Sequence, residues 1–125
     1  MKRINITAGD LMAQAELSES ACASAVFDSL PIEGEVNTWG QEVYFSTPVD
    51  ADLSRDARVD MEMGEVAYWP PGKAICIFFG ATPASGSDGK PRAASSVNPI
   101  GRIVGDATAF RTLRDGQKIV LTVKS

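Results

Sequence analysis

Most aromatic side chains of this chain stand in three short stretches, where they are suited to form a binding surface. They are both tryptophans, both tyrosines and three of the five phenylalanines, namely Trp39, Tyr44, Phe45, Tyr68, Trp69, Phe78 and Phe79. The second stretch runs directly into a Pro-Pro-Gly turn at 70–72. Trp and Tyr beside such a turn suit a groove for an extended or proline-containing peptide. Binding in a groove is therefore the first chemistry that these residues offer.

Strand geometry limits how many of these aromatics can share one pocket. Successive residues of a strand point to opposite faces, so Tyr68 and Trp69 separate, as do Phe78 and Phe79. At most half of the set can therefore line any one pocket. The others fill the core, where aromatic side chains dominate the energetics, and for each single aromatic the core is the simpler interpretation.

Few other residues offer catalytic chemistry. Glu42 and Glu65 lie near the aromatics and invite a general acid/base hypothesis, although solvated acids at strand ends are the simpler interpretation. Ser95 and Ser96 lack a histidine or lysine partner that would activate a hydroxyl. The chain contains no histidine, which excludes histidine-based acid/base catalysis and any histidine metal site.

No cofactor or metal site is predicted. Cys22 and Cys76 stand apart rather than in a CxxC pair, and we interpret both as buried thiols. The acidic segment 47–60 lacks the ligand spacing and the glycine turn of a calcium loop, so it is interpreted as a surface loop.

Length and composition predict one globular domain over residues 1–125. The chain is 44% hydrophobic and 22% charged, with a net charge of −4. Its acids concentrate before residue 66 and its bases after it, which we interpret as charges that pair across the strands of one fold. No basic cluster favours nucleic acid, and no apolar run is long enough to span a membrane. A cytoplasmic location is expected.

The elements that must position the aromatics are short strands. Residues 2–8 and 11–17 alternate as a hairpin, and Ser20 caps a helix of about three turns that ends before Pro31. Further strands are predicted at 32–39 and 42–46, around a Gly40-Gln41 turn, and at 65–69, 75–79, 97–104 and 117–124. Residues 80–96 are expected to form an exposed loop, and 108–113 a helical turn. This mostly β pattern predicts a closed or nearly closed barrel of about eight strands with one short helix packed on it, with an open sandwich as the alternative.

Three segments resemble the small prokaryotic cyclophilin-like proteins. They are Gly64 to Pro83 (GEVAYWPPGKAICIFFGATP), Trp39 to Phe45 (WGQEVYF) and Ser95 to Ile103 (SSVNPIGRI). With the hairpin, the helix and the last strand, the resemblance covers nearly the whole chain. It implies an eight-stranded cyclophilin-like barrel with a helix packed on it.

The resemblance also raises prolyl isomerisation, the activity of larger cyclophilins, in which an arginine weakens the double-bond character of the prolyl amide. Residues 37–45 lie where those proteins carry a Phe-His-Arg motif, and they contain neither histidine nor arginine. Arg102 is the one candidate for a displaced catalytic arginine, although a solvated or charge-paired strand arginine is the simpler interpretation.

Three functions are therefore predicted. The first is a cyclophilin-like binding module, lacking efficient isomerase activity, with an aromatic-lined groove for a peptide or small molecule. Its predicted ligand-binding residues are Trp39, Tyr44, Tyr68, Trp69, Phe78 and Arg102. The second is a peptidyl-prolyl isomerase that uses Arg102, and the third is a structural subunit whose exposed aromatics are buried in a homodimer.

Overall fold

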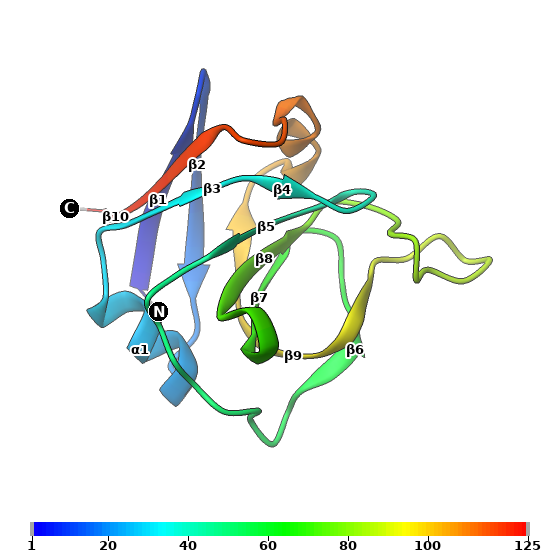
Figure 1. Cartoon of the computed structure of the whole chain (residues 1–125), viewed down its shortest axis with the longest axis horizontal. Coiled ribbons are helices and arrows are strands. Elements are labelled where there is room, and N and C mark those ends of the chain that lie inside the picture. Colours follow the sequence, from blue (N-terminus) through cyan, green and yellow to red (C-terminus); the bar gives the residue numbers. More distant parts are fainter. Residues whose placement is uncertain (1, 125) are drawn as a thin grey trace.

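The computed structural model describes residues 2–124 of the chain (Figure 1). This part of the chain contains ten strands, one α-helix and two short 3-10 helices, joined by turns and loops. The strands are β1 (Lys2–Ala8), β2 (Leu11–Leu17), β3 (Ile32–Glu35), β4 (Asn37–Thr38), β5 (Glu42–Ser46), β6 (Arg58–Asp60), β7 (Glu65–Trp69), β8 (Ala74–Phe78), β9 (Arg92–Val104) and β10 (Lys118–Val123). The helices are α1 (Ala21–Asp28), η1 (Pro70–Gly72) and η2 (Ala107–Thr112). None of the helices in residues 2–124 has the length and apolar character needed to cross a membrane.

The predicted closed barrel of about eight strands is wrong. The ten strands form a sheet in the order β3-β10-β1-β2-β9-β7-β8-β5-β4, with β6 paired to β9 beside this path. The sheet curls (Figure 1), but within residues 2–124 no ladder joins its two end strands, β3 and β4.

The backbone around Val36, which joins β3 and β4, explains why the two end strands of the sheet do not pair. Val36, between β3 and β4, donates its N–H to the Gln117 carbonyl at 2.8 Å and accepts from the Gly116 N–H at 2.8 Å. Its backbone groups are therefore already paired. A Cβ placed on Gly34 in β3 would lie 3.1 Å from the Phe45 Cβ and 3.2 Å from the Ser46 carbonyl oxygen. Here β3 meets β5 by packing rather than by a ladder, which leaves the sheet open.

The N-terminal hairpin and the helix start are confirmed. β1 and β2 pair antiparallel from Lys2 opposite Leu17 to Ala8 opposite Leu11. The Ser20 Oγ accepts the Ala23 N–H at 3.1 Å, as expected of an N-cap. The helix is shorter than predicted and ends at Asp28. Leu30 precedes a proline, and that position disfavours helical backbone angles.

Other boundaries shift because strands find distant partners. The predicted strand 32–39 divides in two, since β3 pairs with β10 whereas β4 pairs with β5. The expected surface loop 47–60 ends in β6, and the expected loop 80–96 becomes strand at Arg92. The reversal after β7 places the left-handed conformation on Lys73, with φ of 47°, rather than on the neighbouring Gly72.

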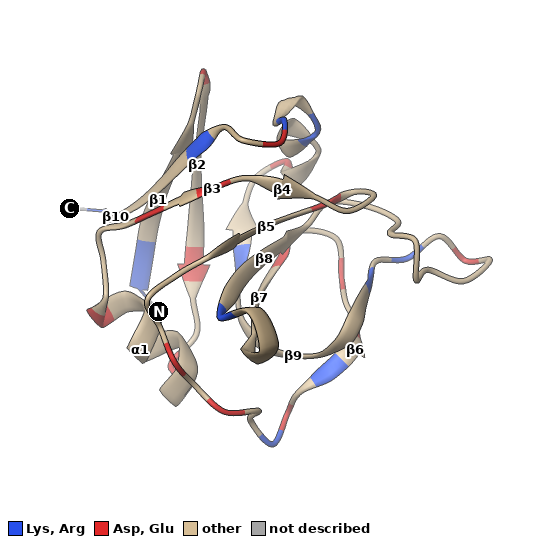
Figure 2. Ribbon diagram, in the orientation of Figure 1, with Lys and Arg blue, Asp and Glu red and all other residues tan. Residues whose placement is uncertain are grey.

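Opposite charges pair across neighbouring strands, as predicted for one fold (Figure 2). Within residues 2–124 the pairs of this kind are Arg3 with Glu16, Arg92 with Asp60, and Lys118 with Glu33. All three are exposed, so each contributes little to stability.

The strands β5, β7 and β8 are apolar on both faces. One face contributes Phe45, Tyr68 and Ile77 to the main core that fills the curl of the sheet. The other face carries a smaller cluster, formed by Met61, Ala67, Cys76, Phe78, Ala93 and Val97. Every residue of β8 is buried, as its continuous apolar run predicted. The candidate site lies on the face of the sheet that carries this smaller cluster.

Candidate functional site

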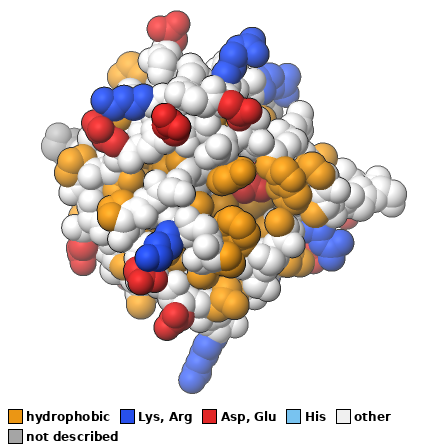
Figure 3. Space-filling model, viewed as in Figure 1, with side chains coloured by type: hydrophobic (Ala, Val, Ile, Leu, Met, Phe, Trp, Pro, Cys, Tyr) orange, Lys and Arg blue, Asp and Glu red, His pale blue; other side chains and the backbone are white. Residues whose placement is uncertain are grey.

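An apolar pocket of about 200 Å³ opens on the face of the sheet that carries the smaller cluster. Its lining residues are Trp39, Glu42, Tyr44, Trp69, Cys76, Ala93, Ala94 and Val97. Figure 3 shows a hollow on this side of the molecule, with hydrophobic side chains around acidic atoms. A volume of this size corresponds to roughly six or seven water molecules, which is the scale of a small head group or one side chain.

Strand register brings the central residues of the pocket together. Glu42 and Tyr44 are two apart on β5, so they point to the same face. Across the ladder to β8, Glu42 lies opposite Phe78 and Tyr44 lies opposite Cys76. Residues directly opposite one another share a face, so β5 and β8 supply one wall and the floor.

Trp39 reaches the pocket from the turn between β4 and β5. The backbone N–H of Trp39 donates to the Glu42 backbone carbonyl at 2.9 Å, and this hydrogen bond closes the turn. Gly40 takes φ of 60°, and a Cβ there would lie 2.8 Å from the Thr82 Cα. The turn therefore packs directly on the segment after β8, and glycine is required at its tip.

Trp69 forms the wall on the other side, at the end of β7. Its indole Nε1 donates to the Ser95 Oγ of β9 at 2.7 Å. Gly72 lies beneath the ring, because a Cβ on Gly72 would come within 2.8 Å of the Trp69 Cε3 and Cζ3 atoms. Gly72 of the Pro-Pro-Gly turn has no Cβ, and the Trp69 indole occupies the space that a Cβ would need.

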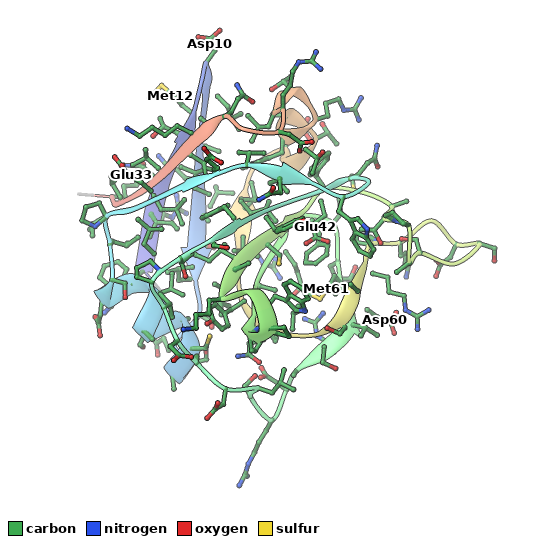
Figure 4. All side chains as sticks on the ribbon, in the orientation of Figure 1. Asp10, Met12, Glu33, Glu42, Asp60 and Met61 are labelled. Atoms are coloured by element: carbon green, nitrogen blue, oxygen red, sulfur yellow. The ribbon has the colours of Figure 1, made fainter. Side chains whose placement is uncertain are left out.

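Among residues 2–124, Glu42 is the single Asp, Glu, Lys or Arg whose side chain lines the pocket. It is only 5% exposed, and Figure 4 shows it close to the turn that joins β4 and β5. Desolvation by burial raises the pKa of its carboxyl group to about 7, whereas a hydrogen bond with the Cys76 thiol acts in the opposite direction. Within residues 2–124 no lysine or arginine forms an ion pair with Glu42.

Cys76 is a buried thiol, as its apolar surroundings predicted. Burial raises the pKa of this thiol well above its ordinary value, and the nearby Glu42 carboxylate raises it further. A thiol that resists ionisation is a poor nucleophile, so Cys76 acts at the pocket floor as a hydrogen-bond donor and an apolar surface.

The structure brings together three of the six predicted ligand-binding residues, Trp39, Tyr44 and Trp69. Phe78 is fully buried in the cluster beneath the pocket. Tyr68 points to the other face, as alternation along β7 predicted, and lies in the main core. Its hydroxyl donates to the Val49 carbonyl at 2.6 Å and accepts the Ala51 N–H at 3.3 Å.

Arg102 lies outside the pocket lining, on an exposed part of β9. It stands opposite Glu65 of β7 and Glu16 of β2 in the ladders. Those two carboxylates already pair with other arginines, Glu65 with Arg58 and Glu16 with Arg3. The structure therefore does not bring Arg102 to the aromatic residues.

The two glutamates considered for acid/base chemistry have different surroundings. Arg58 binds Glu65 with two hydrogen bonds, at 2.8 and 2.6 Å, and the Glu62 N–H adds a third at 2.8 Å. Glu65 is thus held in a structural ion pair. Of the two glutamates only Glu42 lines the pocket, and its interpretation as a solvated strand-end acid is wrong because the residue is 5% exposed. Its position between Trp39 and Tyr44 was the sequence signal for this role.

Gly72→Ala tests how the Trp69 wall is positioned. The added methyl group would overlap the indole, so the ring must move and its hydrogen bond to Ser95 must weaken. We expect a shifted Trp69 indole N–H signal in the NMR spectrum and a loss of roughly 1–2 kcal/mol in the free energy of unfolding.

Gly86→Ala is the matched control for this variant. A Cβ on Gly86 meets only the Asp88 Oδ1, at 4.0 Å, and Gly86 does not require positive φ. Its unfolding free energy should stay within about 0.5 kcal/mol of the parent, with both indole signals in place. Equal effects of the two substitutions would contradict the assigned role of Gly72.

The sequence of this chain matches the family model described as cyclophilin-like over residues 2–122. The chain therefore belongs to the cyclophilin-like family. The same fold occurs in a hypothetical protein from Archaeoglobus fulgidus, known from a solution structure, with 40% sequence identity and a TM-score of 0.81. That match covers 98% of this chain and 95% of the archaeal chain. No curated protein matches the sequence.

Proposed function

We propose that this cyclophilin-like chain is a binding module whose aromatic pocket takes a small molecule or a peptide side chain. The observation that carries the proposal is the convergence of Trp39, Tyr44 and Trp69 from separate segments around one preformed cavity. An apolar cavity with a few polar groups is the usual form of a ligand site. The proposed binding residues are these three aromatics and Glu42.

The surroundings of the pocket favour binding over prolyl isomerisation. An isomerase needs a donor aimed at the prolyl nitrogen, and no arginine or lysine in the described part of the chain lines this cavity. Arg102, the candidate from the sequence, stands on an exposed part of β9. The lining residues that carry polar groups are Glu42, Tyr44, Cys76 and the two tryptophans, and the Trp69 indole N–H is already bound to Ser95.

The experiment uses the two tryptophans as reporters, because both line the pocket. A short peptide with a central Ala-Pro bond and a set of small aromatic and aliphatic fragments are titrated separately into labelled protein. We expect both indole N–H signals to shift, with dissociation constants on the order of millimolar, and no catalysed cis–trans exchange in the peptide.

Two results would overturn the proposal. Catalysed exchange at the prolyl bond would establish an isomerase, and Arg102→Lys would then test the displaced donor. Indole signals that no probe moves would leave the pocket without a binding role. Met12→Ala is the control variant, since Met12 is 82% exposed and does not line the pocket.

A further inference from the structure

The aromatic pocket combines two features that act on positive charge. The faces of aromatic rings carry negative partial charge, and tryptophan attracts cations more strongly than tyrosine or phenylalanine. Three of the lining side chains are aromatic, and two of these are tryptophans. Glu42 adds a carboxyl group to the same lining.

Glu42 is also a buried acid whose charge has no partner cation in residues 2–124. A buried carboxylate without a cation is costly, and proteins normally pair or neutralise it. Its carboxyl group forms a hydrogen bond with the Cys76 thiol, a weak donor. When this carboxyl is ionised, its counter-charge has to come from a bound cation, because no ion pair within residues 2–124 supplies one.

Resting on the function proposed above, we infer that this pocket selects an alkylammonium head group, carried by a small amine or by a methylated lysine side chain. Trp39, Tyr44 and Trp69 surround the alkyl groups on nitrogen, and the Glu42 carboxylate neutralises the charge. Aromatic cages of this kind recognise quaternary ammonium groups in general. The cavity of about 200 Å³ has room for such a head group.

The ionisation of Glu42 couples this selectivity to pH. The polar residues that line the pocket with Glu42 are Cys76 from β8, Tyr44 on β5, Trp39 from the β4–β5 turn and Trp69 from β7; no lysine or arginine among residues 2–124 lines it. Because the pKa of Glu42 is about 7, most of the carboxyl is protonated at pH 6 and most is ionised at pH 8. A permanent cation should therefore bind about tenfold more tightly at pH 8.

The test compares choline with its neutral carbon isostere, 3,3-dimethylbutan-1-ol. Both are titrated at pH 6 and pH 8, with the two indole N–H signals as the readout. We expect choline to bind at least tenfold more tightly than the alcohol at pH 8, and this difference to shrink at pH 6. A short peptide with one trimethyllysine, beside the same peptide with unmodified lysine, distinguishes a side-chain source from a free amine.

Two variants separate the contributions of charge and rings. Glu42→Gln keeps the shape of the side chain but removes its charge, so choline should lose at least tenfold in affinity, the pH dependence should vanish, and the alcohol should bind as before. Trp39 lies in a surface turn, so Trp39→Leu removes an aromatic ring from the pocket and should weaken the binding of both probes. Signal dispersion in the NMR spectrum checks that each variant is folded.

The outcomes distinguish this inference from the proposed function. Equal affinities for choline and the alcohol would leave an aromatic binding pocket but overturn its selectivity for cations. Failure of choline and the trimethyllysine peptide, together with indole shifts caused by the alcohol or by other fragments, would do the same. Indole signals that respond to no probe would overturn both.

Discussion

Glu42→Gln is expected to raise the free energy of unfolding at pH 9 by roughly 2–3 kcal/mol, an unusual sign for a change at a buried position. Burial raises the pKa of Glu42 from 4.5 to about 7 in the folded chain. The folded state therefore holds this proton more tightly than the unfolded state. The resulting stabilisation is fully present below pH 4.5 and is lost as pH rises through 7, at a total cost of roughly 3 kcal/mol.

Chemical unfolding at pH 5, 7 and 9 measures this effect. The parent chain should lose stability across the series through Glu42, whereas Glu42→Gln should show a flatter profile. Glu33→Gln is the control, because Glu33 forms an exposed pair with Lys118 and its loss should change stability by less than about 1 kcal/mol. Parallel pH profiles for the parent and Glu42→Gln would show that the carboxyl is not desolvated as the structure indicates.

Tyr68→Ala is expected to lower the free energy of unfolding by about 3–5 kcal/mol, the largest loss among the variants considered. The Tyr68 side chain is fully buried, so truncation leaves a cavity in the main core. It also leaves the Val49 carbonyl and the Ala51 N–H without the hydroxyl that binds them. Unfolding in denaturant at constant pH measures the loss.

Trp69→Ala is the matched comparison, one residue along the same strand. Trp69 is half-buried at the pocket, so its truncation should cost less, about 1–2 kcal/mol, but should abolish most of the probe binding. Tyr68→Phe, which removes only the hydroxyl, should lose about 1–3 kcal/mol and keep the binding. Equal losses of binding in folded Tyr68→Phe and Trp69→Ala would contradict the assignment of the two residues to opposite faces.

These contrasts follow from three strands that are apolar on both faces. One face of β5, β7 and β8 builds the main core, and the other carries the pocket on a smaller cluster. Substitutions of residues that line the pocket are therefore expected to change its shape and charge while the main core stays intact. The same arrangement explains how an acid such as Glu42 becomes buried without lying in the main core.

Local patterns predicted much of the fold. The N-terminal hairpin, the Ser20 cap and the strand 65–69 could be located from alternation, capping chemistry and turn residues. The separation of Tyr68 from Trp69 followed from strand geometry alone. The shape of the whole sheet could not be obtained in this way, because closure depends on contacts between distant segments, such as Gly34 with Phe45 and Val36 with Gly116.

For the candidate site, too, the sequence predicted some features and only the tertiary structure decided the others. Residue types and their order were enough to gather Trp39, Tyr44 and Trp69 into one hypothesis, and to leave the chain without histidine chemistry. Whether Glu42 meets water or an apolar pocket depends in part on Ala93, Ala94 and Val97 of β9, which lie some fifty residues further along the chain and line the same pocket only after folding. Desolvation is a property of that enclosure and not of the residue, so only the folded chain gives this carboxyl a pKa near 7.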